Sequence, residues 1–413
     1  MKLKFTTFLF LINTVLLQAQ LSQQWLNNFC CFDSVGPHTF SFPLGKEFNQ
    51  DTLTISFFED YFLKFEKINV VTGDSIQCAT FLSDTIQSSF YYGGGTTKIT
   101  NQYITSAVKY NNINGQFKLF HSAVDNSITQ LWSNEILISS GKISAPISNL
   151  SGSNFYTCGV SDSIRIFKQT IGGMQQWITA FPLMNTNNIR QPYLYINSLD
   201  QIIIYVRNSD SILTHSSVRL IKVNSINGSL LLDSVYTNSL GTSHVQLQVN
   251  DTLKIAFLKV PGQEISFLDI NLGSLNEIKY LPGIIPCLSD LTKFSVDSFT
   301  HNYYLKTSDN FLGYTEQDTL LFNVNLAPEK QDQYDLGGLA FDQQNVFLSY
   351  SFYNSFNNPP NNDIRILKLN KTNGSIVDSA DYNDIRNTDE NFIDDYFDEI
   401  GRASCRERVC YPV

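Results

Sequence analysis

The chain has 413 residues, of which 42% are apolar, 13% aromatic and only 16% charged, against about 25% charged residues in an average soluble domain. The apolar content supports a large core. Asn, Ser, Thr and Gln replace the missing charge, and these residues suit turns and exposed strand faces better than solvated helices. The net charge of −10 disfavours nucleic acid and anionic membranes as partners.

Residues 1–20 have the pattern of a signal peptide. A basic start precedes an apolar stretch from Phe5 to Leu17, and Ala19 offers a small residue for cleavage. The stretch is shorter than the roughly 20 apolar residues of a membrane-spanning helix, and no later segment reaches that length. We therefore expect a secreted, extracellular or cell-surface protein without an integral membrane segment. The alternative is a buried N-terminal strand.

Residues 400–413 differ in composition from everything before them. Three Arg and two Cys occur within residues 400–410, and this stretch resembles a translated sequencing adapter. We treat 400–413 as non-native and expect the natural product to continue past Glu399; the alternative is a genuine basic tail. Without both terminal segments the net charge becomes −14, because five basic residues and one acidic residue are removed from a total of −10.

The cysteines outside this tail match no metal-binding framework, because there is no C-x-x-C and no neighbouring His pair. An exported chain can oxidise its thiols, so the adjacent Cys30 and Cys31 have one interpretation as a strained vicinal disulfide. The simpler expectation is that such cysteines are small buried hydrophobic residues. The cysteines are Cys30, Cys31, Cys78, Cys158 and Cys287.

One short phrase occurs three times, at Lys67–Gly73, Lys222–Gly228 and Lys368–Gly374. It reads Lys, apolar, Asn, two free positions, Thr or Asn, and Gly. The Asn side chain can bond the backbone two residues on, and the Gly supplies a positive φ. The phrase therefore predicts a β-hairpin, and nothing in it carries chemistry.

Degenerate copies of the hairpin fill the intervals between the clear ones. The predicted turns lie near residues 73, 127, 173, 228, 275, 329 and 374; the sixth is expected to follow a strand at Leu320–Asn325. In a second series, an Asn or Asp opens an apolar, β-branched strand seven times at a spacing of about 50 residues. This series starts at Asp51, Asn101, Asn154, Asp200, Asp251, Asn302 and Asn345.

Two series in phase predict an all-β fold, a β-propeller of about seven four-stranded blades over residues 21–399. Six or eight blades are alternatives. Tandem β-sandwiches of about 100 residues each are the rival architecture. We expect an inner strand at Ile202–Val206, and partly solvated outer strands at Val218–Lys222 and Ile364–Lys368.

The segment Ser22–Phe29 resembles Met174–Phe181, which follows a turn as an outgoing strand. We expect the N-terminal copy to complete the last repeat. The hairpin phrase, together with Trp132 and Trp177, resembles the blades of quinoprotein-like and related propellers of secreted bacterial proteins. The resemblance implies a fold only, and extends to propeller modules exported by the type-nine secretion route with a C-terminal sorting domain.

Every candidate for chemistry in the sequence is weak. There is no H-E-x-x-H, no G-x-S-x-G and no P-loop, and the histidines show no metal spacing, so we expect them to be structural or exposed. We predict no catalytic, cofactor-binding or metal-binding residue. The histidines are His38, His121, His215, His244 and His301.

Two charged sets have both a functional and a structural interpretation. The acidic segment Asp389–Glu399 could hold Ca²⁺ through oxygen ligands, but it lacks the Gly and alternation of a Ca²⁺ loop and is better explained as a solvated face or the start of another blade. Three of the repeats carry an arginine at the equivalent position, namely Arg165, Arg219 and Arg365. They either line a binding surface or lie over a neighbouring strand with buried stems.

We therefore expect a monomeric, secreted, non-catalytic propeller that binds a protein, peptide or glycan on its loop faces. The alternative is an extracellular carbohydrate-active hydrolase or lyase with carboxylates in the central funnel. An Asp/Glu pair converging on the axis favours the enzyme, whereas a lining of Asn, Ser and aromatic residues favours binding.

Overall fold

The computed structural model describes residues 41–382, except for residues 50–51, 60–61, 70–74, 83–87, 112, 139–141, 184–191, 210–215, 260–263, 282–290, 298, 308, 327–338 and 355–360. Within these residues all regular structure is β-strand. No helix in the described part of the chain has the length and apolar character needed to cross a bilayer. The predicted signal peptide, the copy at Ser22–Phe29, the acidic segment and the tail all lie outside the described residues.

The described strands form seven blades, numbered in chain order. Blades 1 to 3 contain β1 (Ser41–Asn49), β2 (Thr52–Glu59), β3 (Phe62–Asn69), β4 (Ser75–Leu82); β5 (Ser88–Ile99), β6 (Gln102–Asn111), β7 (Gln116–Asp125), β8 (Gln130–Ile138); and β9 (Lys142–Ile143), β10 (Ile147–Ser148), β11 (Asn154–Val160), β12 (Ser163–Thr170), β13 (Gln175–Pro182).

Blades 4 to 7 continue the same pattern. They contain β14 (Tyr193–Ile196), β15 (Ile202–Ser209), β16 (Ser216–Val223), β17 (Leu230–Val249); β18 (Thr252–Lys259), β19 (Glu264–Asn271), β20 (Asn276–Leu281); β21 (Leu291–Val296), β22 (Tyr303–Thr307), β23 (Asn310–Tyr314), β24 (Leu320–Asn325); and β25 (Leu339–Phe341), β26 (Asn345–Asn354), β27 (Asn361–Asn370), β28 (Ile376–Tyr382).

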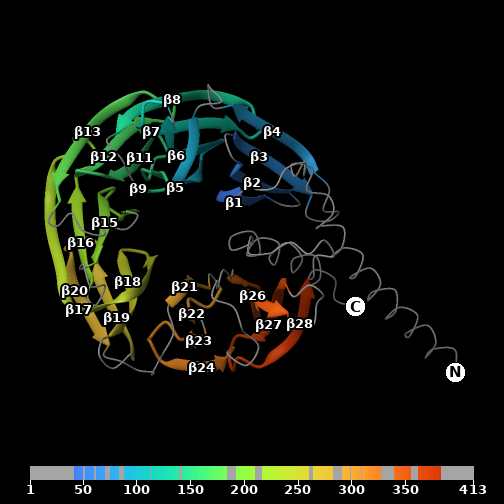
Figure 1. Cartoon of the computed structure of the whole chain (residues 1–413). Coiled ribbons are helices and arrows are strands. Elements are labelled where there is room, and N and C mark those ends of the chain that lie inside the picture. Colours follow the sequence, from blue (N-terminus) through green and yellow to red (C-terminus); the bar gives the residue numbers. More distant parts are fainter. Residues whose placement is uncertain are drawn as a thin grey trace.

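Each blade is an antiparallel sheet whose strands follow chain order, with the first strand nearest the common centre and the last on the outside (Figure 1). The long β17 serves two blades, because its first part pairs with β16 and its second part with β18. In blade 3, β9 and β10 share the inner position beside β11. The prediction of seven blades is confirmed for the described residues, and tandem sandwiches are excluded.

Both repeat series have clear places in a blade. The Asn or Asp series marks the start of the second strand, as at Asn154 of β11 and Asn345 of β26. The hairpin phrase is the turn between the third and fourth strands. In blade 4, the Asn224 side-chain oxygen accepts a bond from the Ile226 backbone N–H at 2.8 Å, and Gly228 has a φ of 73°. The predicted roles of Asn and Gly are confirmed there.

One predicted turn is wrong. Leu320–Asn325 is β24, the outermost strand of blade 6, and not the strand that precedes a turn near residue 329. The hairpin turn lies at Thr315–Thr319, where the Asp318 N–H bonds the Thr315 carbonyl. This turn lacks glycine, since Asp318 itself takes the positive φ of 67°. The Lys, Asn and Gly phrase on which the prediction relied does not occur at Thr315–Thr319, where the turn lies.

The expected outer strands also need correction. Val218–Lys222 lies in β16 and Ile364–Lys368 in β27, and both are third strands covered by β17 and β28. Arg219 and Lys222 are buried, with exposed fractions of 4% and 5%. The expectation of an inner strand at Ile202–Val206 is confirmed, because these residues lie in β15 and are buried. The outermost place of blade 7 is taken by β28.

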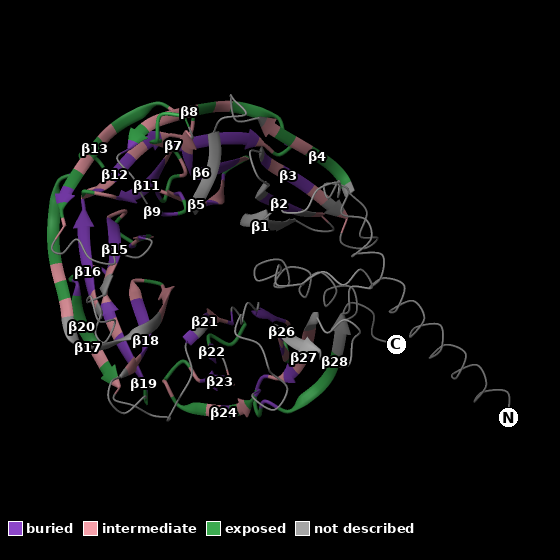
Figure 2. Ribbon diagram, viewed as in Figure 1, coloured by how far each residue is buried: buried purple, intermediate pink, exposed green. Residues whose placement is uncertain are grey.

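The core lies in layers between neighbouring blades, while the outermost strands are largely exposed (Figure 2). One layer joins blades 3 and 4 through side chains such as Tyr156, Ile166, Ile204 and Ile221. Burying one such aliphatic or aromatic side chain contributes roughly 1.5–3 kcal/mol. Because each layer needs two sheets, no blade has a complete core by itself.

The hairpin turns also bind the preceding blade. Trp132 of blade 2 donates its Nε1–H to the Ile171 carbonyl at 2.8 Å, and Trp177 of blade 3 donates to the Ile226 carbonyl at 2.9 Å. The first lysine of the phrase makes similar bonds, because Lys67 reaches the Asn126 carbonyl. Lys168 donates to the Ser225 carbonyl in the turn of blade 4, and Lys222 donates to the Gly273 carbonyl in the turn of blade 5. The phrase thus specifies contacts between blades as well as a turn.

Candidate binding surface around the central axis

The innermost strands carry almost no acidic residues. β5, β9, β10, β14, the second part of β17 (240–249), β21 and β25 contain neither Asp nor Glu, and only β1 carries one, Glu47, whose side chain is not described. Tyr, Gln, Ser, Thr, Gly and Lys occupy the polar positions of these strands instead. The outermost strands carry Glu135, Asp233, Glu277, Asp378 and Asp381.

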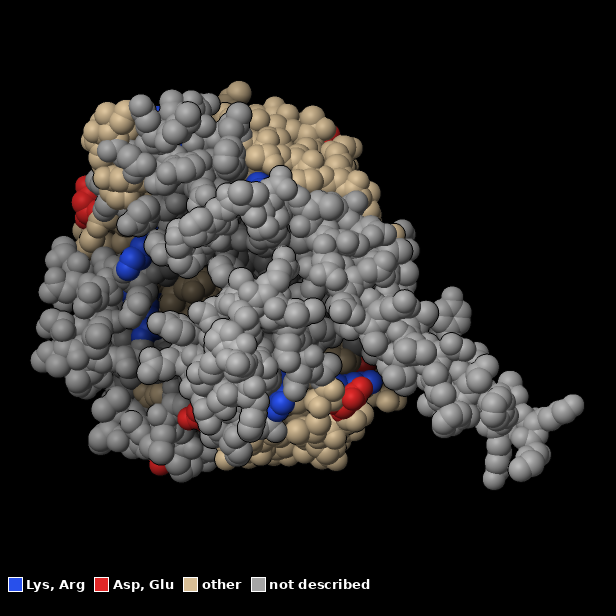
Figure 3. Space-filling view, turned by 45° about the vertical axis from the view of Figure 1, so that its right-hand side comes forward, with Lys and Arg blue, Asp and Glu red and all other residues tan. Residues whose placement is uncertain are grey.

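Lysines are the only charged residues on the innermost strands of blades 2 to 7. Lys142 at the start of β9 is exposed, and Lys98 near the end of β5 stacks over the Tyr103 ring at 5.7 Å. Lys293 of β21 lies in register with the fully buried Lys306 of β22, which brings two cationic side chains to neighbouring positions. Figure 3 shows Lys and Arg atoms beside a hollow on the face turned toward the viewer.

A tyrosine cluster occupies the inner part of blade 4. Tyr193 and Tyr195 of β14 both make edge contacts with Tyr205 of β15, at centroid distances of 6.0 and 6.4 Å. Burial raises the pKa of Tyr195, and a hydrogen bond with Gln246 of blade 5 partly opposes this shift. Tyr193 remains 45% exposed. The cluster therefore offers one accessible aromatic ring on a rigid base, which suits stacking against a ligand.

Among the described side chains, the two histidines His121 and His301 form no acid–base arrangement. His121 is fully buried in β7, and burial lowers its pKa to about 3, so the imidazole is neutral at physiological pH. His301 occupies a tight turn with a φ of 59° and is exposed. The expectation of structural or exposed histidines is confirmed for these two. His38 and His215, and the side chain of His244, lie outside the described residues.

The two described cysteines, Cys78 and Cys158, differ in burial and in whether they form a disulfide bond. Cys158 is buried and free, and burial raises its thiol pKa, as expected of a small core residue. Cys78 of β4 is exposed and disulfide-bonded. Cys30, Cys31 and Cys287 lie outside the described residues.

The three arginines all lie in third strands, but they form no common surface. Arg219 donates to both carboxylate oxygens of Asp233, at 3.0 and 2.6 Å, and to the Pro182 carbonyl of blade 3 at 2.6 Å. Arg165 pairs with Asp162 at 3.2 Å, and Arg365 is partly buried in β27. The interpretation of a buried stem over a neighbouring strand is confirmed for Arg219.

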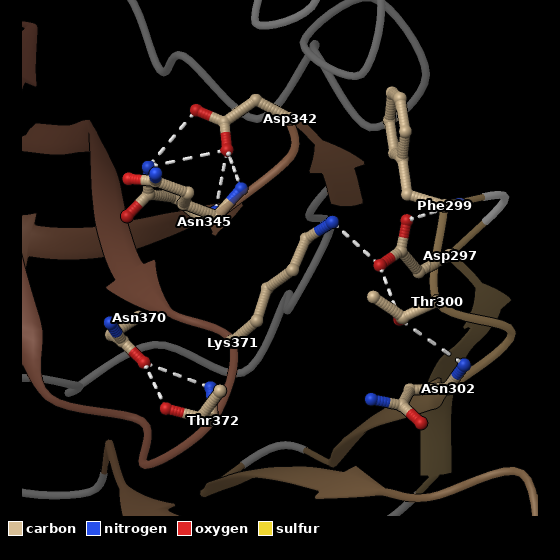
Figure 4. Close-up of polar contacts among 10 residues, drawn as sticks. Asp297, Phe299, Thr300, Asn302, Asp342, Asn345, Asn370, Lys371 and Thr372 are labelled. Atoms are coloured by element: carbon tan, nitrogen blue, oxygen red, sulfur yellow. Dashed lines mark hydrogen bonds and ion pairs between the residues drawn. The ribbon is translucent and has the colours of Figure 1, made fainter.

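Lysine and aspartate form a buried pair between blades 6 and 7 (Figure 4). Lys371 follows Asn370 in the phrase of blade 7, and its Nζ lies 2.6 Å from Asp297 Oδ2. The exposed fractions of the two side chains are 3% and 0%. The Lys371 ammonium also lies 4.9 Å from the centroid of the Phe299 ring, and Thr300 donates to Asp297 at 2.6 Å. Asp297 thus accepts hydrogen bonds from both Lys371 and Thr300, and the pair links the hairpin of blade 7 to blade 6.

No three His, Cys, Asp or Glu side chains gather as metal ligands in the described part of the chain. The sequence contained no signal for Lys142, Lys293 or Tyr193, because both repeat series mark the second strand and the outer hairpin. The innermost strands vary from two to twelve residues and follow no phrase. These residues share only their place on innermost strands.

No family model matches the chain, and no curated protein matches it in sequence. Many solved structures resemble it in fold. One structure, from an analysis of two prolyl endopeptidases and their inter-domain dynamics, gives a TM-score of 0.52 at 9% identity, over 89% of this chain and 55% of that one. Prolyl oligopeptidase B from Galerina marginata gives 0.52 at 11% identity, over 88% and 55%.

A protein of unknown function from Bacteroides caccae is similar over 70% of this chain and 94% of its own, at 11% identity and a TM-score of 0.37. This chain spans about half the length of the two prolyl peptidase structures. At such low identity the likeness concerns the fold alone. The comparisons therefore support an all-β, propeller-like fold.

Proposed function

We propose that the protein is a secreted, monomeric, non-catalytic propeller that binds a peptide or glycan partner near its central axis. The observation that carries the proposal is the absence of Asp and Glu from the innermost strands of blades 2 to 7. A glycoside hydrolase in such a funnel usually needs a pair of carboxyl groups at the reacting bond. This lining of tyrosine, amide, hydroxyl and lysine groups supports binding instead.

The inner lysines favour partners that carry negative charge, such as acidic peptides or uronic-acid glycans. The protein as a whole has a charge of −10, so an acidic partner is repelled by most of its surface. Lys142 of β9 and Lys293 of β21 add basic residues to the innermost strands, and Tyr193 of β14 adds a partly exposed aromatic ring. Aromatic rings and amides are typical of sugar and peptide recognition, whereas charge selects among the ligands that they admit.

Export is part of the same proposal. The basic start and short apolar stretch of residues 1–20 support passage through a secretory route, and the resemblance to bacterial secreted propellers suggests the type-nine route. Expression in a bacterium that has this route, followed by fractionation, tests it. Retention of the full-length chain in the cytoplasm would contradict export.

An array of peptides and glycans with acidic and neutral members tests the binding function. We expect retained ligands to be predominantly acidic, and to remain chemically intact after incubation when examined by mass spectrometry. Cleavage of a retained glycan would support the hydrolase or lyase alternative. A blank array would count against the binding function.

A further inference from the structure

Cys78, on the outermost strand of blade 1, forms a disulfide bond with a cysteine that lies outside the described residues. Cys158, the other described cysteine, is buried and free, so it is not the partner. Two of the remaining cysteines belong to the tail that we treat as non-native. The native candidates are Cys30, Cys31 and Cys287.

The position of Cys287 in the chain argues against it as the partner. It precedes Leu291 of blade 6 by four positions, and four residues span at most about 14 Å. Blade 6 lies across the ring from blade 1 (Figure 1). The adjacent pair Cys30 and Cys31 remains.

Cys78 lies on the face of blade 1 that is turned away from blade 2. It is in register with Glu66 of β3, whereas Leu63 and Phe65 of the same strand pack into the apolar layer shared with blade 2. Successive residues of a strand point to opposite faces of a sheet, so Glu66 and Cys78 share the other face. Glu66 is nevertheless completely buried. A further part of the chain therefore covers this face.

The equivalent face of blade 4 provides a template for this cover. When the hairpin phrases of blades 1 and 4 are aligned, Glu66 corresponds to Ile221 and Cys78 corresponds to Asp233. Both pairs are in register across the third and fourth strands of their blades. The surroundings of Asp233 therefore indicate which part of the chain lies beside Cys78.

The end of the preceding outermost strand covers that face of blade 4. Ile221 belongs to the apolar layer between blades 3 and 4, and Leu183, directly after β13, packs against the same layer. Arg219 joins the two blades at this point, because it donates to Asp233 and to the Pro182 carbonyl. The equivalent of Cys78 thus lies beside the end of β13.

Blades 2 and 3 repeat the arrangement. Ile138, at the end of β8, shares an apolar cluster with Phe167 of blade 3, which occupies the place of Glu66 in its own blade. Ile138 follows Trp132 by six positions, just as Leu183 follows Trp177 by six. At both interfaces the sixth residue after the tryptophan therefore faces the next blade.

The N-terminal segment carries this tryptophan and, six positions later, a cysteine. Because Ser22–Phe29 resembles Met174–Phe181, Trp25 corresponds to Trp177, and the sixth residue after it is Cys31. In an extended strand the side chain of Cys30 points to the opposite face. Since β28 fills the outermost place of blade 7, a strand formed by this segment is additional to those of the seven blades.

We propose that residues 22–31 pack as an additional outermost strand against blade 1, and that Cys31 is the disulfide partner of Cys78. The bond fastens the N-terminal segment covalently to the first blade. Cys30 keeps a free thiol, in place of a vicinal disulfide with Cys31.

Formation of the bond needs an oxidant of the kind that acts on exported proteins. The two thiols lose two protons and two electrons as the sulfur–sulfur bond forms. The disulfide of a thiol–disulfide oxidoreductase accepts them and becomes a dithiol. The pairing itself does not depend on ligand binding at the central axis.

Peptide mapping of the non-reduced, full-length protein tests the pairing. Trypsin cuts at Lys46 and Lys67, which places Cys31 and Cys78 on separate peptides. After alkylation of free thiols, we expect these two peptides to be joined, and fragment spectra to show the alkyl group on Cys30. An alkyl group on Cys31, a free thiol at Cys78, or a link from Cys78 to any other cysteine would overturn the proposal.

Thermal unfolding with and without a thiol reductant tests the effect of the bond on stability. Because Cys78 is exposed, a reductant can reach the bond. We expect reduction to lower the Tm of the wild type, since the unfolded chain is then less constrained, and Cys31→Ser to show the lower Tm in both conditions. Cys30→Ser is the matched control and should behave as the wild type. Equal Tm values for the two variants would contradict the proposal. If Cys31→Ser does not fold, the peptide map of the wild type decides.

Discussion

At the scale of single residues, the hairpin turn of each blade shows that a backbone conformation can persist without its usual residue. Gly228 has a φ of 73°, and the equivalent Leu275 of blade 5 has a φ of 53°. Both donate their N–H to the Asn that opens the turn. Leu275 is only 2% exposed and packs into the core of blades 4 and 5, which offsets the strain of roughly 1–3 kcal/mol.

Substitution of Gly228 tests this account. Gly228→Ala places a Cβ at positive φ and 2.9 Å from the Trp177 ring, so we expect a loss of roughly 1–3 kcal/mol in the free energy of unfolding, measured with urea. Gly172→Ala is the control, because its nearest neighbour is 3.7 Å away and its φ is not positive. Equal stability of the two variants would contradict the account.

The buried His121 gives a pH dependence of stability. Its pKa is about 3 in the folded protein and about 6.5 in the unfolded chain, so the unfolded state binds more protons between these values. Its contribution is therefore intact above pH 6.5 and is lost as the pH falls toward 3, by about 1.4 kcal/mol per pH unit at most.

Urea unfolding at several pH values measures this slope, with His121→Gln as the comparison. We expect the variant to show a smaller change in unfolding free energy between pH 6.5 and pH 4. Parallel curves for the two proteins would mean that His121 does not carry the dependence. The same substitution at His301, which is exposed, is the control for replacing a histidine by glutamine.

At the scale of elements, the fold depends on contacts that each hairpin makes with the blade before it. The pair Lys371–Asp297 joins blades 6 and 7 and is buried on both sides. Removing one member of such a pair leaves an unpaired buried charge, which costs about 3–5 kcal/mol, whereas replacing both costs less.

A double-mutant cycle with Lys371→Met and Asp297→Asn tests this coupling. We expect each single variant to lower the free energy of unfolding by a few kcal/mol, and the double variant to lose less than the sum of the two. Additive losses would mean that the two side chains act independently and that the blade interface does not depend on their pairing.

The secondary-structure elements could be predicted where a local residue pattern repeats. The prediction failed where tertiary packing determines the conformation or the burial of a residue. Asn followed by Gly marked the turns of blades 4 and 7, but Asp318 and Leu275 adopt the same conformation through tertiary contacts. Arg219 lies in a buried strand although its charge suggested an outer one, because Asp233 and a backbone carbonyl satisfy its guanidinium. No local pattern records such distant partners.

At the scale of the whole molecule, charge is distributed radially. Acidic residues occur on the outermost strands of blades 2, 4, 5 and 7, whereas the innermost strands of blades 2 to 7 contain no Asp or Glu and those of blades 2, 3 and 6 carry a lysine. The number of blades could be predicted because the Asn or Asp series marks the start of the second strand of every blade, and the hairpin series marks most of the outer turns. The inner surface could not be predicted, since its residues come from strands of unequal length that are far apart in the chain.

The most direct test of the proposed function is a calorimetric titration of the strongest acidic ligand from the array into wild type, Lys142→Gln and Gln176→Glu. The two variants change the net charge equally, but Gln176 lies on the exposed outer strand β13. We expect Lys142→Gln to weaken binding roughly tenfold, the loss of one charge-assisted hydrogen bond, and Gln176→Glu to leave it unchanged. Equal affinities for all three proteins would contradict binding at the central axis.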